Sequence, residues 1–451
     1  MNRIDFPLTL VFIVLLSVVS DAAAQDQPII PVRLADATQL AMKKRPEIKM
    51  ETEKENIAES KVLEQKGNFL PTIDLYGTND YTDNYDQFSG THITGWVGNE
   101  RIAADVTNEV PAYQVRGQLE LNYNLFAGGR DKALLSEAKN NLNSVQQQKT
   151  LVERKIQLEV AKAYWELKKA QVELAITKRD IEIVQWEEKV AQTKIQVHRM
   201  SDLEYEAILL KKNESLMAQK KTTRDCLDAL RNYLYVLGIP RDEVDLATIQ
   251  IPDLLDSPSV DTSVEETPSV HPDILKLRSD LQAAVEKVKT EKAGYYPTID
   301  FFAEYSCIGR DDEEYVEAWN DSESAYFKVG LTLSMNIFNG NRTMARIAQA
   351  KAHMRKQKLQ LDLKERQLDR IREIKQTALD TANDEWRLAI ERKRLEETRL
   401  KAAESEFQAH RISELKYRQK VIEAENATDK VIITTIDVVL ARNERELLIL
   451  D

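Results

Sequence analysis

The sequence contains the same unusual succession of segments twice. The stretch LNYNLFAGGR, from Leu121 to Arg130, recurs in the second half of the chain as LSMNIFNGNR, from Leu333 to Arg342. The tetrapeptide PTID also occurs twice, starting at Pro71 and at Pro297, and the octapeptide HRMSDLEY is matched by HRISELKY. Three ordered matches at nearly one offset indicate a duplicated unit. Whatever this chain folds into must therefore be built from two copies of one succession of elements.

Each copy contains segments in which apolar and polar residues alternate. The clearest run from 113 to 126 and from 327 to 337, and weaker ones follow the two PTID prolines. A period of two places all apolar side chains on one face of a strand. The pattern therefore predicts two strands per copy, joined by polar loops at roughly 82–110 and 308–325.

Two interpretations of these strands stay open from the pattern alone. They suit a soluble antiparallel sheet with its apolar face inward. They also suit membrane barrel strands of about 9 to 11 residues, with the apolar face toward lipid and the polar face toward a water-filled lumen. On the second interpretation the lipid-facing side chains include Leu119, Leu121, Tyr123, Leu331, Leu333 and Met335.

A helical run of about 70 residues without proline follows the second strand of each copy. At 1.5 Å per residue it is roughly 100 Å long. In the first copy apolar residues repeat at heptad spacing from Ile156 to Ile195, and a second stripe from Leu158 to Val197 is offset by two residues. Two residues turn such a helix by about 206°, or about 154° the other way. A helix with two such stripes packs against two flanking helices, as in a ring, and twelve helices fit this angle best although eight or ten lie within the scatter of helix packing.

Shorter helical patterns complete the first copy. One runs from 34 to 66 with a break at Arg45-Pro46, and another runs from Asp202 to a stop at Gly238. Residues 25–240 therefore form repeat 1 and residues 271–451 form repeat 2. Residues 241–270, which are rich in proline, form a linker between them. Residues 1–24 have the apolar run and small residues of a cleaved export signal.

Composition excludes several classes of protein. The 451 residues carry a net charge of -12, which argues against nucleic-acid binding because phosphate neutralisation needs a basic surface. There is no HExxH, G-x-S-x-G or complete phosphate-binding loop, so we expect no enzyme, no cofactor and no metal site. With only Cys226 and Cys307, no disulfide framework is indicated. Beyond the export signal no apolar run reaches the length of about 20 residues that a membrane helix needs, so an exported chain of this kind stays in solution or enters a membrane as β-structure.

The strand count also bears on assembly. Four strands per chain cannot close a membrane barrel, since known barrels begin at eight strands. A homodimer would supply eight strands and a homotrimer twelve. The residues alone leave both open.

The motifs taken together point to a family. The helix followed by FLPTID or YYPTID, the strands ending LNYNLFAGGR and LSMNIFNGNR, and the duplicated order resemble TolC-type outer-membrane efflux proteins over essentially the whole mature length. The resemblance implies a mainly helical fold with a membrane β-barrel portion that is complete only in a homotrimer. Twelve strands would form a pore among the lipids of the outer membrane, and twelve helices a hollow cylinder extending into the periplasm. The cylinder would dock a periplasmic adaptor, or membrane fusion protein, coupled to an inner-membrane transporter, for passive passage in efflux or type I secretion.

The resemblance also places a docking tip and a channel entrance. Members of the family often have Val-Gly-Leu-Ser at the tip, whereas basic residues stand in the corresponding positions here. The tip comprises His198, Arg199, Met200, Ser201, His410, Arg411, Ile412 and Ser413, and the entrance candidates are Asp202, Glu204, Glu206, Glu414, Lys416 and Gln419. Glu204 can supply the acidic ring of the family in the first repeat, but Lys416 and Gln419 replace it in the second. The sequence therefore does not decide whether the entrance is cation-selective. The alternative is that these charges form ordinary solvated helix surface.

One other function deserves comparison. A periplasmic adaptor or a structural coiled-coil protein of the envelope would account for the long helices. It would not account for two pairs of strands with one apolar and one polar face. The sequence therefore favours the channel, while it does not identify the transported substrate.

Overall fold

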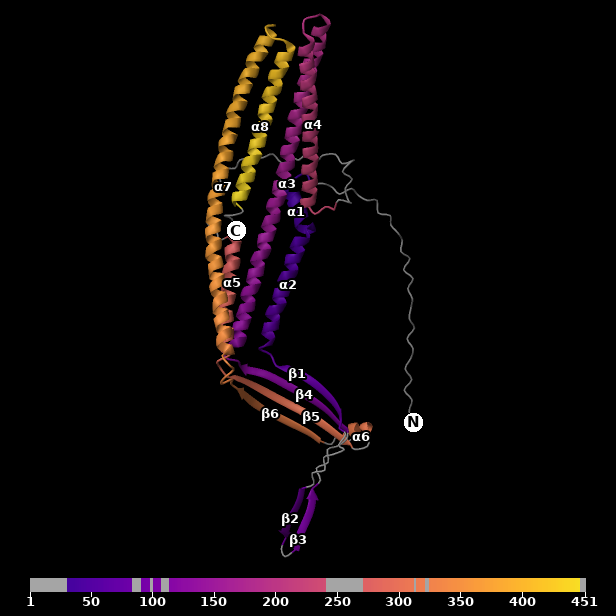
Figure 1. Cartoon of the computed structure of the whole chain (residues 1–451), viewed down its shortest axis with the longest axis vertical. Helices are drawn as coiled ribbons and strands as arrows, with labels where there is room; N and C mark the ends of the chain where they lie inside the picture. Colours follow the sequence, from indigo (N-terminus) through magenta and orange to yellow (C-terminus); the bar gives the residue numbers. More distant parts are fainter. Residues whose placement is uncertain are drawn as a thin grey trace, which may run out of the picture.

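The computed structural model describes residues 31–82, 91–97, 100–106, 113–240, 271–311, 314–320 and 324–446. The export signal at 1–24 and the whole linker at 241–270 lie outside these ranges. Long helices occupy one end of the molecule and a twisted sheet the other (Figure 1). Repeat 1 contains α1 (Leu34–Lys44), α2 (Pro46–Gly67), β1 (Thr72–Tyr81), β2 (Thr91–Val97), β3 (Glu100–Val106), β4 (Tyr113–Phe126), α3 (Arg130–Gln196) and α4 (Asp202–Val236). Repeat 2 contains α5 (Pro272–Ala293), β5 (Thr298–Asp311), α6 (Tyr315–Asn320), β6 (Ser324–Ser334), α7 (Arg342–Gln408) and α8 (Glu414–Glu446).

The duplication is visible in matching elements. Helices α2 and α5 both have 22 residues and both begin with proline, whose fixed φ suits the first helical position. Helices α3 and α7 both have 67 residues. In both repeats a helix, strands, a long helix and a second helix follow one another in this order.

The four predicted strands form one antiparallel sheet in the order β1-β4-β5-β6. The register aligns the apolar positions across the sheet: Ile73 lies opposite Leu121, Leu121 opposite Ala303, and Ala303 opposite Val329. A second row, one residue along each strand, consists of Asp74, Glu120, Glu304 and Lys328. Since neighbouring residues of a strand point to opposite faces, the sheet has one apolar and one polar face along its whole width.

Three details of the strand prediction are wrong. The predicted loop at 82–110 contains a β-hairpin, β2 paired with β3, formed by segments rich in the β-branched residues that favour strands. In repeat 2, β5 continues to Asp311 and α6 follows it, so that predicted loop is also shorter than expected. Strand β6 ends at Ser334, so Met335 does not lie in a strand. Strand β6 ends there because its partner β5 begins only at Thr298, opposite Ser334. The residue before Thr298 is Pro297, which has no N–H to continue the hydrogen-bond ladder.

The predicted pair of apolar stripes on the long helix is confirmed. The first stripe is almost fully buried against α4, with Val160 and Leu167 completely shielded from solvent and Thr177 hydrogen-bonded to Thr222. The second stripe lies toward α8, where Lys169 pairs with Asp437 at 2.8 Å. Helix α3 is thus flanked on two sides, as the offset between the stripes requires.

The helices form a single curved layer. Near the sheet the contacts run α2, α3, α5, α7, and near the opposite end they run α4, α3, α8, α7. A core around the middle of α3 packs α1, α3 and α4 together. Within it, the Tyr164 hydroxyl donates to the Val32 carbonyl at 3.0 Å and the Tyr233 hydroxyl to the Pro31 carbonyl at 2.9 Å. None of the helices in the described ranges is long and apolar enough to cross a membrane.

Candidate functional site

The two turns at the end of the long helices share one backbone geometry. The amide of Arg199 donates to the Lys194 carbonyl at 2.8 Å, and the amide of Arg411 donates to the Glu406 carbonyl at the same distance. These are the closing hydrogen bonds of a Schellman motif, which needs a left-handed residue just before. That residue is histidine in both turns, with φ of 54° at His198 and 57° at His410.

The next helix begins in a different way in each turn. Ser201 accepts from the amide of Glu204, and the Glu204 carboxylate accepts from the Ser201 amide at 2.9 Å, which completes a capping box. In repeat 2, Ser413 accepts from the amide of Lys416 at 3.3 Å, but a lysine in this position cannot accept in return. The two turns therefore have the same shape, but the first is more tightly closed.

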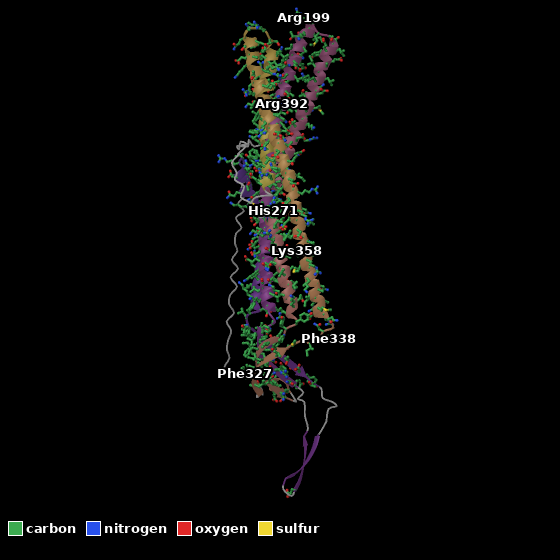
Figure 2. The ribbon with its side chains drawn as sticks, turned by 90° about the vertical axis from the view of Figure 1, so that its left-hand side faces the viewer. Arg199, His271, Phe327, Phe338, Lys358 and Arg392 are labelled. Atoms are coloured by element: carbon green, nitrogen blue, oxygen red, sulfur yellow. The ribbon has the colours of Figure 1, made fainter. Side chains whose placement is uncertain are left out.

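The tip presents its basic residues to solvent. His198, Arg199, His410 and Arg411 are exposed, whereas Met200 and Ile412 are half-buried beneath them. Both turns lie at the same end of the molecule, farthest from the sheet (Figure 1), and Arg199 lies at its extremity (Figure 2). The structure thus brings together all eight residues predicted for the tip, while their role in docking stays a prediction.

The predicted entrance residues do not form one cluster within the chain. Asp202, Glu204 and Glu206 lie in the first turns of α4, and Glu414 pairs with Arg418 on α8 at 2.9 Å. The hydrogen bonds from Ser201 hold the pKa of the Glu204 carboxyl below its usual range. Glu204 is therefore a helix-capping residue in this chain, and whether it also lines an entrance stays a prediction.

Gln419 has a partner that the sequence did not reveal. It donates to Glu187 on α3 at 2.9 Å, and the same carboxylate pairs with Lys211 on α4 at 2.5 Å. The residues directly before these two also meet, because the Arg418 guanidinium lies 4.3 Å from the centre of the Trp186 ring. These contacts join three helices close to the tip, and the only signal for them was the second stripe on α3, which ends in this region.

The face toward which the helical layer curves contains two cavities. One, of about 630 Å³, lies among α2, α3 and α5, and the other, of about 650 Å³, lies among α3, α5 and α7. Both are lined by Glu137, Asn141 and Asp280. On α3, Arg130 lies two turns before Glu137 on the same side of the helix and lines a cavity together with Glu120 and Asn122 of the polar sheet face. Glu137 therefore lies on the side of the layer that continues the polar face of the sheet, and this side is called the inner wall. Burial raises the pKa of the Glu137 carboxyl, a property that the sequence pattern did not predict.

The apolar face of the sheet is exposed in a single chain. The exposed fractions of Leu75, Leu331 and Leu333 are 80%, 65% and 69%. Leu119 is exposed as well, and Leu121 and Tyr123 are half-buried. So large a set of exposed apolar side chains on one face indicates an apolar surrounding rather than water. Their contact with lipid stays a prediction.

Comparison with known proteins decides the class of the chain. The model of the outer membrane efflux protein family matches residues 37–199 and 265–433, one segment in each repeat and well over half of the sequence. The chain belongs to this family. It is therefore an outer-membrane channel of an efflux system, and the prediction of a channel rather than an adaptor is confirmed. Outer membrane efflux proteins are channels, a non-enzymatic kind of protein. No curated protein matches the sequence.

Solved structures share the fold. VceC, an outer membrane protein from Vibrio cholerae, superposes with a TM-score of 0.71 at 13% identity, over 92% of this chain and 95% of VceC. A membrane protein from Pseudomonas aeruginosa gives 0.69 at 16% identity, over 92% and 89%. The CmeC outer membrane channel of Campylobacter jejuni gives 0.69 at 12% identity, over 92% and 85%. At these identities the likeness establishes the fold, and it does so along nearly the entire chain.

The unequal caps lead to a test. We expect Ser201→Ala to destabilise the start of α4 by about 1 kcal/mol, the usual cost of losing a serine cap. Ser413→Ala should cost less because the second turn has no capping box. Hydrogen exchange of the amides at 203–206 and 415–418 measures both effects, and equal acceleration in the two turns would contradict the assignment.

The same cap should depend on pH in a defined direction. Because the pKa of Glu204 is lowered in the folded chain, its contribution is complete above the ordinary carboxyl pKa and is lost as pH falls through the folded value. Protection of the 203–206 amides should therefore weaken in acid, and Glu204→Gln should abolish that dependence.

Proposed function

We propose that the chain acts as a homotrimer that forms a passive conduit, with an adaptor docked at the tip and an inner-membrane transporter supplying the energy. The observation that carries the proposal is that one chain has matching unfilled edges on both sides of its sheet and of its helical layer. Members of the family are typically trimers within tripartite systems, which agrees with this arrangement.

The sheet has two open edges. Within the described residues, β1 pairs only with β4, and β6 pairs only with β5. An open edge leaves backbone N–H and C=O groups without partners, and in hydrocarbon each such group costs several kcal/mol. Pairing β6 of one copy with β1 of the next removes both edges once the ring closes.

The helical layer has open edges at the same two sides. Helices α2 and α4 border one side and α7 borders the other. Each carries apolar side chains that are about half exposed or more in a single chain. They are Met50 and Ile57 on α2, Leu203, Leu210 and Met217 on α4, and Leu359, Leu363, Leu388 and Leu395 on α7. On α4 these residues follow a strict heptad, which is the spacing of a helix that packs along another.

The heights of these residues agree between the two edges. Helix α2 ends beside the sheet at Gly67 and α7 begins there at Arg342, so the two would run antiparallel in neighbouring copies. The number of residues from Met50 to Gly67 equals the number from Arg342 to Leu359. In neighbouring copies these two side chains would therefore lie at the same height above the sheet. One turn nearer the sheet, Glu53 and Lys356 are likewise equally far from these helix ends, so a carboxylate would lie opposite an ammonium.

The number of copies follows from geometry. Each chain contributes four helices at every level of the layer, so two copies give eight and three give twelve. The two stripes on α3 are separated by about 154°, which is closer to the roughly 150° interior angle of a twelve-membered ring than to the roughly 135° of an eight-membered one. Three copies also give twelve strands, within the range of known membrane barrels.

The tips are suited to an acidic partner surface. Four exposed basic residues per chain become twelve in a trimer, and like charges crowded in a ring repel one another. Of the nearest carboxylates, Glu204 already caps its own helix and Glu414 pairs with Arg418. An adaptor with carboxylates at its end would balance the remaining charge and guide the encounter.

The strand faces give a direct test of membrane placement. An arginine at Leu119 or Leu121 should cost about 2 to 4 kcal/mol if these side chains face lipid near the midplane. At Leu333, which lies opposite Ile299 at the start of β5, it should cost only about 0 to 1 kcal/mol. The same substitution at Asn122 or Ser334, on the polar face, should be tolerated. Heat-resistant assembly in outer-membrane fractions is the measurement, and equal tolerance on both faces would contradict the lipid-facing assignment.

The docking role of the tip has its own test. The double variant Arg199→Gly/Arg411→Gly should preserve assembly and membrane insertion, because both arginine side chains are exposed and the left-handed residues His198 and His410 are unchanged. Co-purification with the native adaptor should weaken, most of all at low salt where charge attraction is strongest. If adaptor binding stays unchanged across a salt series and transport is intact, the basic residues are surface charges only.

A further inference from the structure

A third cavity opens at the junction of the helices and the sheet. Its volume is about 460 Å³, and its lining includes Lys292, Tyr295, Tyr296, Met344, Lys351 and Arg355. It combines three cationic side chains with two tyrosines. None of the functions argued above uses it.

This cavity lies on the outer face of the helical layer. On α7 it is lined by Lys351 and Arg355, whereas the inner cavity is lined by Arg346 and His353. At about 100° per residue, Lys351 lies about 140° around the helix from Arg346. The cavity among α3, α5 and α7, which Arg346 lines, lies on the inner wall. Lys351 and Arg355 therefore lie on the opposite, outer surface of the helical layer, outside the proposed conduit.

The cavity also lies at the boundary of the membrane. Tyr295 and Tyr296 immediately precede Pro297 and the start of β5, and Lys351 lies within the first turns of α7. The tyrosines are 53% and 59% exposed, and Phe338 nearby is 79% exposed at the sheet end of α7 (Figure 2). Tyrosines at this height occupy the position where such side chains collect between hydrocarbon and water.

The three cations converge on the cavity from two directions. Side chains lean toward the N-terminus of their helix. Lys351 and Arg355 therefore lean toward the sheet, because α7 begins there, whereas Lys292 leans away from it because α5 ends there. All three are exposed, and none forms an ion pair with a carboxylate of the described residues. In the sequence, the segment 342–358 contains six Lys or Arg and no Asp or Glu, so α7 supplies nothing here to neutralise them.

We propose that this cavity binds the headgroup phosphate of an anionic phospholipid in the inner leaflet of the outer membrane. The cations contact the phosphate oxygens, and the tyrosines lie at the level of the glycerol backbone. The acyl chains then run along the exposed apolar face of the sheet. Basic pockets at the membrane surface select anionic lipids in this way, and the tyrosines favour a lipid over free phosphate, which would need only the cations.

The first repeat lacks the full set of residues. At the offsets of the duplication, Lys292 and Lys351 correspond to Lys66 and Lys139, but Arg355 corresponds to Asn143 and Tyr295 to Phe69. Tyr296 corresponds to Leu70, and Met344 to Lys132. The duplicated position therefore keeps three cations but has lost both tyrosines. This predicts one site per chain, in the second repeat alone.

Native mass spectrometry of the full-length protein tests the proposal with three probes: short-chain phosphatidylglycerol, short-chain phosphatidylcholine and inorganic phosphate. We expect one phosphatidylglycerol bound per chain and much weaker binding of the other two. Lys351→Gln/Arg355→Gln should lower the affinity for phosphatidylglycerol about tenfold or more, since each cation near a membrane surface contributes measurably. The control Arg346→Gln/Lys358→Gln removes the same charge from α7. Of its two positions, Arg346 lines the inner cavity and Lys358 lies about 10 Å farther from the membrane than Lys351.

Every outcome of this experiment is decisive for the site. Selective loss in the first variant with full binding in the control supports it. Equal loss in both variants means that only net charge matters, and equal retention means that the cavity does not bind lipid; either overturns the proposal. Binding of inorganic phosphate as tight as that of phosphatidylglycerol would reassign the cavity to free phosphate. A failure of the trimer proposal would appear separately, as a change in the number of chains per particle.

Discussion

The rest of the structure depends on the hydrogen-bonding needs of the two outer strands. A sheet of four strands in a membrane leaves two rows of backbone groups without partners, and hydrocarbon provides none. One chain cannot curl four strands into a closed barrel. The sheet is therefore a fraction of a barrel by construction, and its exposed apolar face, with Leu75 and Leu333 mostly uncovered, has a stable environment only when other copies complete it.

The helical layer obeys the same rule by a different interaction. Duplication produced two 67-residue helices, α3 and α7, but gave them unlike surroundings. Helix α3 lies in the interior of the helical layer, and neighbouring helices cover both of its apolar stripes. Helix α7 lies at the edge of the layer and leaves Leu359 and Leu395 exposed. The sheet and the helical layer are thus open at corresponding sides. In the proposed trimer, the rotation that closes the sheet would also bring α7 against α2 and α4 of the next copy.

The parts of the fold that rest on repeated patterns could be predicted from the sequence. Period-two alternation located all four strands of the main sheet, and the two stripes located the neighbours of α3, because burial on a fixed side dictates residue type at each step. The end of β6 could not be predicted, since it depends on where the partner strand begins, and Pro297 lies far from Ser334 in the sequence. The hairpin of β2 and β3 was missed because it lies within a generally polar stretch.

The candidate site was predictable in position but not in detail. The repeated HRMS and HRIS segments placed both tips correctly, because each sits between two helical patterns. The capping by Glu204 was not foreseen, although a serine followed three residues later by glutamate is its known signature. Glu187 and Glu137 were missed for another reason. Glu187 meets Gln419 from a helix far away in the sequence, and Glu137 is buried by neighbouring helices, whereas single residues on a long polar helix give no periodic signal.

The claim that copies meet through α2 and α7 can be measured by disulfide cross-linking. In a chain whose Cys226 and Cys307 are replaced by alanine, Met50→Cys and Leu359→Cys should form a disulfide between neighbouring copies, because packed heptad positions bring Cβ atoms close enough. Denaturing electrophoresis after oxidation should show covalent species of two and three chains and none larger, and pairing Met50→Cys with Leu395→Cys, at a different height, should give none. A ladder that stops at two chains, or a chain that stays monomeric in the membrane after oxidation, would contradict the trimer.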